Sequence, residues 1–159
     1  MTAHPAARPL LLDLFCGAGG SAVGYHRAGF DIVGVDHRPQ PRYPFEFVRC
    51  DALTFLASPF VDLGKFAAVH ASPPCQAYAN VTGWRGSRSD HPDLVAATRT
   101  ALEAAGLPWV IENVPEAPVR PDLLLCGSQF GLNVRRHRAF ETSPRLFTLL
   151  PPCHHRDLL

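Results

Sequence analysis

Residues Leu10–Ser21 read LLLDLFCGAGGS, and this stretch decides the fold class of the chain. The run Leu10–Phe15 is largely apolar, as in a fully buried parallel strand. Glycines follow it, and Ala22–Ala28 then predicts a helix that Gly29 ends. A strand, a glycine turn and a helix form a unit that holds nucleotides, because glycines let the backbone approach the ligand and the helix N-terminus favours negative charge.

Two acidic residues follow at the ends of predicted strands. The strand Asp31–Val35 leads to Asp36, about twenty residues after the glycines, where a carboxylate can accept hydrogen bonds from ribose hydroxyls. The alternative is a solvated aspartate without a ligand. A third strand, Phe45–Cys50, leads to Asp51, which would reach the amino group of an adenine. The first half of the chain therefore predicts a site for an adenosine-containing cofactor.

The tetrapeptide Pro73–Gln76 (PPCQ) follows a short buried strand predicted over Phe66–Ala71. Two consecutive prolines fix the backbone and remove two donors, so Cys75 is expected on a stiff loop at the carboxyl end of a strand. Ligands of open α/β sheets bind at that edge. Cys75 is therefore a candidate nucleophile; the alternative is a small, inert core residue.

The segment after Cys75 predicts a loop followed by a helix. Residues 77–89 combine Tyr78 and Trp84 with arginines, which suits base stacking and phosphate contact, and they form a candidate lid over a nucleic-acid site. The helix is expected to begin near Asp90–Pro92 and to end at Gly106.

A buried strand predicted over Leu107–Val114 carries Glu112 and Asn113 near its end, on the same sheet edge as Cys75. Further elements are expected towards the C-terminus. They are a strand over Leu123–Cys126, a helical turn over Gly127–Gly131, a strand over Arg136–Thr142 and another over Phe147–Leu150.

The composition indicates one globular domain in a reducing compartment. The chain has 159 residues, 47% of them hydrophobic, which is enough for a sizeable core. No apolar run approaches the roughly 20 residues of a membrane span, and the N-terminus does not resemble a secretory signal. The five cysteines are odd in number and irregularly spaced, which favours free thiols and a cytoplasmic location, in a bacterium or encoded by a phage.

The net charge of +1 excludes no class of partner, but the basic residues are biased. Lys65 is the single lysine among the 15 lysine and arginine residues. Genomic base composition explains the bias in general. It does not explain the clusters Arg85/Arg88 and Arg135/Arg136/Arg138, whose planar guanidinium groups suit phosphates and base edges.

Four motifs occur together in the order and approximate spacing of the DNA cytosine-5 methyltransferases, and the chain resembles that family over residues 10–143. The motifs are Asp13–Gly20 (DLFCGAGG), Pro73–Gln76 (PPCQ), Glu112–Val114 (ENV) and Arg136–Arg138 (RHR).

The resemblance implies an α/β fold of the class I S-adenosylmethionine-dependent methyltransferases. This Rossmann-like fold has a mostly parallel twisted sheet with one reversed strand and helices on both faces. It implies S-adenosyl-L-methionine as cofactor and S-adenosyl-L-homocysteine as product. The cofactor-binding residues carried over by position are Phe15, Gly17, Gly19, Asp36, Asp51, Ala52 and Pro73.

The resemblance also implies methyl transfer to C5 of cytosine in DNA, through a covalent cysteine adduct on a flipped-out base. Cys75 would attack C6, Glu112 would act as the acid at ring N3, Arg138 would hold the base, and Arg136 would support it. Nearby arginines would favour the thiolate.

The chain departs from the family pattern after the arginine motif, because longer members continue with a target-recognition domain and a segment that completes the cofactor site. We expect a disordered lead-in over residues 1–9, a catalytic domain over 10–150 and a tail over 151–159. We also expect self-association or a protein partner that replaces the missing segment, and no membrane contact. The alternatives are a non-catalytic, cofactor-binding paralogue that needs a partner for DNA recognition, and a nicotinamide-binding Rossmann protein, which leaves the PPCQ motif unexplained.

The tail contains residue types that bind zinc. Cys126, Cys153, His154 and His155 could form a site, but no CxxC pair is present, so we favour a solvated tail and expect no metal.

Overall fold

A computed structural model describes residues 7–75, 78 and 93–155. The chain divides into two compact units: Met1–His70 with Ala101–Leu107, and Ala71–Thr100 with Pro108–Leu159. Among the described residues, no helix is both long enough and apolar enough to span a bilayer.

The first unit is built on a parallel sheet with the strand order β3-β2-β1-β4. Strand β1 (Leu10–Leu14) pairs in parallel with β2 (Asp31–Asp36), and β2 pairs in parallel with β3 (Glu46–Arg49). Strand β4 comprises Ala68–Ala71. The helices, in chain order, are α1 (Gly20–Arg27), α2 (Ala52–Ala57) and the 3-10 helix η1 (Leu63–Lys65).

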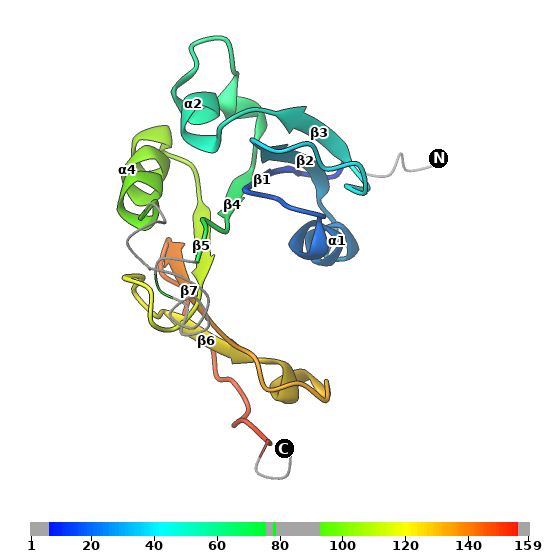
Figure 1. Ribbon diagram of the computed structural model, residues 1–159, viewed down its shortest axis with the longest axis vertical. Helices are drawn as coiled ribbons and strands as arrows, with labels where there is room; N and C mark the ends of the chain where they lie inside the picture. Colours follow the sequence, from blue (N-terminus) through cyan, green and yellow to red (C-terminus); the bar gives the residue numbers. More distant parts are fainter. Residues whose placement is uncertain (1–6, 76–77, 79–92, 156–159) are drawn as a thin grey trace, which may run out of the picture. The chain divides into compact units, whose positions relative to one another are not determined.

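Both faces of β1 are covered. Leu11, Leu12 and Leu14 are each no more than 2% exposed, although successive side chains of a strand point to opposite faces. On one face, Leu11 packs with Ala22 of α1 and Ile32 of β2, and Figure 1 shows α1 beside these strands. This burial explains why Leu10–Leu14 reads as a continuous apolar run, and it agrees with the predicted parallel sheet.

The second unit contains the one reversed strand of the described sheet. Its strands are β5 (Trp109–Asn113), β6 (Leu123–Cys126) and β7 (His137–Ser143) in the order β5-β7-β6. Strand β7 runs antiparallel to both neighbours, as the predicted mostly parallel sheet with one reversed strand requires. The 3-10 helix η3 (Gly127–Phe130) follows β6, and the helix α4 comprises Val95–Ala105 and contributes to both units.

The strand predicted over Phe147–Leu150 is wrong. These residues are irregular, and Phe147 and Leu149 are 84% and 101% exposed, so their apolar side chains gain nothing from a strand conformation here. The helix predicted to begin near Asp90–Pro92 begins later, at Val95, whose N–H donates to the Asp93 carboxylate at 3.1 Å; residues 90–92 lie outside the described part of the chain. Within the expected lead-in, Arg8 is anchored, since its guanidinium donates to the carbonyl of Gly29 at 3.2 Å.

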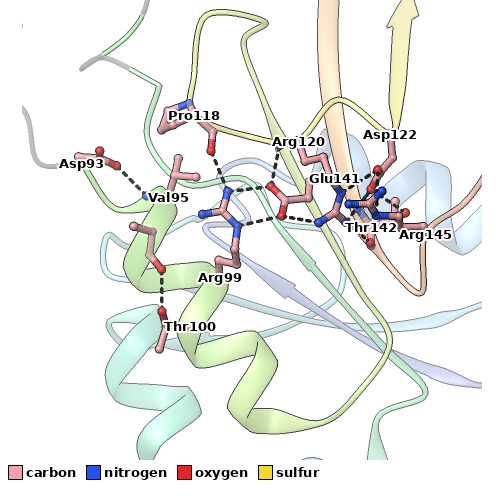
Figure 2. A network of polar contacts seen from close by, with 11 residues as sticks. Asp93, Val95, Arg99, Thr100, Pro118, Arg120, Asp122, Glu141, Thr142 and Arg145 are labelled. Carbon is pink, nitrogen blue, oxygen red and sulfur yellow. Dashed lines mark hydrogen bonds and ion pairs between the residues drawn. The ribbon is translucent and has the colours of Figure 1, made fainter.

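A buried ionic network ties α4 to β7 (Figure 2). Glu141 has a side chain that is 1% exposed, and Arg99 binds it bidentately through Nε and Nη2, at 2.8 and 2.7 Å. The backbone N–H of Arg120 also donates to Glu141, at 2.9 Å. Arg120 in turn binds Asp122 through Nε at 2.8 Å, and Asp122 accepts the N–H of Thr142 at 2.9 Å. These hydrogen bonds lower the pKa of Asp122 to about 2.

Replacing Arg99 with methionine should destabilise the protein strongly. The variant keeps the aliphatic part of the side chain but removes the bidentate partner of a buried carboxylate, which costs on the order of 3 kcal/mol in the free energy of unfolding. Arg145→Met is the matched control, because the Arg145 side chain is 58% exposed and lies 3.9 Å from Asp122, a contact worth less than about 1 kcal/mol. Urea unfolding followed by circular dichroism measures both, and equal shifts in midpoint would contradict the role of Arg99.

Candidate active site

The loop after β1 adopts a backbone conformation that few residues tolerate. Phe15, Gly17 and Gly19 have φ values of 56°, 50° and 88°. A positive φ is uncommon for a phenylalanine, and such local strain often marks a binding site. An added Cβ on Gly17 would find no atom within 4 Å, so the backbone at this position is open to a ligand.

Asp36 lies beside this loop, at the end of β2, as the sequence predicts. The backbone N–H of Gly17 donates to Asp36 Oδ2 at 3.1 Å, and that of Arg38 donates to Oδ1 at 2.9 Å. These contacts hold the carboxylate in place, and each of its oxygens can accept a further hydrogen bond. A ribose diol is a suitable donor.

Asp51 is the N-cap of α2. Its Oδ1 accepts from the backbone N–H of Thr54 at 2.9 Å and from the Thr54 hydroxyl at 3.0 Å. These hydrogen bonds lower the pKa of Asp51, so the carboxylate is fixed and ionised at neutral pH. Ala52 follows as the first residue of α2, and its side chain is 2% exposed. The sequence assigned both residues to an adenine, and the helix start holds their backbone rigid.

Two further residues support this part of the chain and were missed from the sequence: Tyr43, whose ring lies against Gly19, and Asp13. Asp13 is fully buried in β1, and burial raises its pKa to about 7 although the Tyr43 hydroxyl donates to it at 3.2 Å. The Tyr43 ring occupies the space above Gly34, where an added Cβ would lie 2.2 Å from the ring. An isolated glycine inside a strand signals such a close approach, and Gly34 therefore was the available clue.

The PPCQ loop is fastened to the end of β5. The buried side chain of Asn113 donates through Nδ2 to the carbonyl of Pro73 at 3.0 Å. Cys75 follows two residues later and is half-buried, and the N–H of Tyr78 donates to its carbonyl at 3.0 Å. The sequence placed Asn113 at this edge without a role; the structure shows that it positions the loop. Apart from Tyr78, the candidate lid over 77–89 lies outside the described residues, as does Gln76.

Glu112 precedes Asn113 and forms an ion pair with Arg138. Arg138 Nε lies 2.8 Å from Glu112 Oε1, and the two side chains are 24% and 22% exposed. Burial raises the pKa of Glu112, and the positive charges of Arg138 and Arg136 offset only part of this effect. The carboxyl group is thus partly desolvated, which favours its protonated form.

The predicted residues therefore form two groups, each within one unit. The first unit holds Phe15, Gly17, Gly19, Asp36, Asp51 and Ala52, and the second holds Pro73, Cys75, Glu112, Arg136 and Arg138.

Cys16, in the loop after β1, is a poor candidate for the nucleophile, because burial raises the pKa of its thiol to about 12.

Comparison with solved structures identifies the fold of the chain. The structure resembles the Entamoeba histolytica methyltransferase EhMeth, with a TM-score of 0.54 and 17% identity over 84% of this chain and 52% of that one. It also resembles a hypothetical protein of Thermus thermophilus, with a TM-score of 0.50 and 20% identity over 84% of this chain and 75% of that one. The fold is that of the class I S-adenosylmethionine-dependent methyltransferases, with helices on both faces of a mostly parallel sheet.

The sequence is similar to a type II methyltransferase, M.XorII of Xanthomonas oryzae pv. oryzae. The two are 29% identical in an alignment that covers 84% of this chain and 31% of the relative. The chain thus spans about a third of the length of that relative. No family model matches the chain.

Proposed function

We propose that this protein transfers a methyl group from S-adenosyl-L-methionine to C5 of cytosine in DNA. The observation that carries the proposal is the polar end of β5. Glu112 pairs there with Arg138 at 2.8 Å, and Asn113 fastens the Pro73 carbonyl two residues before Cys75. The end of β5 thus contacts Arg138 through the carboxyl group of Glu112, and through Asn113 it holds the loop that carries the Cys75 thiol. The similarity to a type II methyltransferase supports methyl transfer as the type of reaction.

The first unit fits the adenosine part of S-adenosyl-L-methionine. Gly17 leaves its backbone open, the Asp36 carboxylate borders it, and Asp51 and Ala52 provide an ordered helix start. The cofactor supplies an activated methyl group on sulfonium, and S-adenosyl-L-homocysteine is the product. Pro73 is the proposed cofactor contact of the second unit.

The residues of the second unit account for the chemistry on the base. Cytosine C5 is a weak nucleophile, and attack of the Cys75 thiolate on C6 breaks the C5–C6 π bond and makes C5 electron-rich. Glu112 gives its proton to ring N3, which neutralises the charge that develops on the ring. Arg138 orients the base, and Arg136 supplies further positive charge. After C5 accepts the methyl group, loss of its proton re-forms the double bond and expels the thiolate.

DNA is the proposed partner, and the target base must leave the duplex for C6 to be reached. The loop 77–89 is the proposed lid. A bacterial or phage-encoded cytoplasmic enzyme fits this role.

A second proposal is a non-catalytic or partner-dependent subunit that binds the cofactor. It is favoured by exposed apolar side chains in the second unit, including Phe130 (59%), Leu132 (58%), Phe147 (84%) and Leu149 (101%). Side chains exposed in this way are available for contact with another protein, or with a second copy of this one.

The deciding experiment is incubation with labelled S-adenosyl-L-methionine and mixed-sequence DNA, followed by nucleoside analysis. We expect label on 5-methylcytosine and a covalent complex with DNA that contains 5-fluorocytosine, because fluorine at C5 prevents release of the thiolate. Cofactor binding without either product would support the subunit instead. Label on another nucleoside would contradict C5 as the target.

A further inference from the structure

We propose that Cys126, His137, Cys153 and His155 form a structural zinc site. One ligand atom of each residue lies within 4.8 Å of those of the other three. The site belongs wholly to the second unit and does not depend on the proposed methyl transfer, since zinc binding can be measured without DNA or cofactor.

The first pair of ligands is placed by strand register. Cys126 is the last residue of β6 and His137 the first of β7, and they are direct partners in the antiparallel pairing. Directly opposite residues carry their Cβ atoms on the same face, roughly 4.5–5.5 Å apart. A hairpin therefore presents one thiol and one imidazole side by side.

The second pair lies on an irregular segment after β7. Cys153 and His155 are two residues apart, and one ligand atom of each lies within 4.8 Å of those of Cys126 and His137. Both are half-buried, whereas His154 between them is exposed. This alternation selects His155 and rejects His154, which the sequence had included in its candidate set. His137 takes the fourth position.

The distances approach those of a tetrahedral site. Zn–S bonds of about 2.3 Å and Zn–N bonds of about 2.0–2.1 Å place neighbouring ligand atoms roughly 3.3–3.8 Å apart. Cys153 Sγ lies 3.4 Å from His137 Nε2, within this range. The rings of His137 and His155 are 5.3 Å apart at an interplanar angle of 88°. Two thiols and two imidazoles favour zinc over magnesium or calcium, which prefer oxygen.

A set of hydrogen bonds supports the ligands, as in established zinc sites. The Ser128 hydroxyl donates to Cys126 Sγ at 3.4 Å and accepts the N–H of His154 at 3.2 Å. Gln129 accepts the N–H of Cys126 at 2.7 Å and donates to the carbonyl of Pro151, also at 2.7 Å. The segment 151–155 is thus attached to η3 rather than solvated as a tail.

Four protein ligands leave no open position, so the metal would be structural. It would join the segment 151–155 to the β6–β7 hairpin next to Arg138, whose Nη1 donates to the carbonyl of His137 at 2.7 Å. Exposed apolar side chains lie between β6 and β7 in the sequence, with Leu132 at 58% and Val134 at 44%. Binding of a structural metal contributes directly to the free energy of folding.

The test uses the full chain, purified under reducing conditions. We expect one zinc ion per chain by elemental analysis, and replacement by Co²⁺ should give the intense visible bands of a tetrahedral site together with thiolate-to-cobalt charge transfer. Cys126→Ala and His155→Asn should abolish these bands. Ser128→Ala should weaken zinc binding about 10–100-fold, because the Ser128 hydroxyl donates to the ligand atom Cys126 Sγ. The matched controls, His154→Asn and Cys50→Ala, should bind as the wild type does.

Wild-type protein that binds no zinc, or gives the weak spectrum of octahedral Co²⁺, would overturn the proposal whatever the variants do. A disulfide between Cys126 and Cys153 in the reduced preparation, detected by mass spectrometry, would also overturn it. So would loss of the tetrahedral bands in His154→Asn but not in His155→Asn.

Discussion

Cys75→Ser should abolish methyl transfer to DNA and leave binding of S-adenosyl-L-methionine unchanged. The proposed reaction needs a thiolate that attacks C6, and a serine hydroxyl is far less acidic, so without a strong base it does not ionise. Gly17 and Asp36, which we propose bind the cofactor, belong to the other unit and contact each other there without Cys75. Transfer of labelled methyl and calorimetric titration with the cofactor measure the two effects separately.

Cys50→Ser is the control for this variant, because Cys50 is also half-buried and free but belongs to the first unit, whereas the residues assigned to the chemistry on the base belong to the second. It should retain wild-type activity. A Cys75→Ser protein that methylates DNA at the wild-type rate would remove Cys75 from the mechanism. Loss of cofactor binding as well would indicate that the substitution disturbs the fold rather than the chemistry.

The sequence predicted the strands and helix ends that are determined by residues close together in the chain. Alternating or continuous apolar runs located β1 to β7 to within one or two residues, and Asp36 and Asp51 were placed because carboxyl ends of parallel strands share an edge. Gly29, Gly106 and Gly131 marked helix ends, and all three have positive φ.

The features that the sequence did not predict depend on contacts between distant residues. Tyr43 reaches Asp13 across 30 positions, and Asn113 reaches Pro73 across 40. The pairing of Cys126 with His137 follows from strand register, which no local spacing encodes. A CxxC motif does not mark this site, because Cys126 and His137 meet across two strands rather than along one segment.

The failed strand over Phe147–Leu150 has a related cause. Its apolar composition favours a strand, but a strand needs a partner to satisfy its backbone, and the described part of the chain pairs none with it. An apolar composition favours a strand only where the side chains are buried, and Phe147 is 84% exposed.

Glu112→Gln should slow methyl transfer by about 10²–10⁴-fold, the typical contribution of a positioned acid. The glutamine keeps the shape of the side chain and can still accept from Arg138, so the fold and DNA binding should persist. It cannot give a proton to ring N3, and the negative charge that builds up as Cys75 attacks then has no acid to neutralise it. Single-turnover rates with labelled cofactor measure the loss, and the rate of covalent trapping on 5-fluorocytosine DNA should fall in parallel.

The pH dependence separates an acid from a merely structural carboxylate. Burial raises the pKa of Glu112, so the protonated form persists to higher pH than in a free glutamate and is lost as the pH rises through the raised value. Wild-type kcat/KM should therefore fall on the basic side of that pKa, and Glu112→Gln should lack this limb. Glu103→Gln, an exposed substitution on α4, should leave both rate and profile unchanged. Near-normal turnover of Glu112→Gln, or a fall of kcat/KM at high pH that matches the wild type, would mean that another group donates the proton. Glu112 would then only position Arg138.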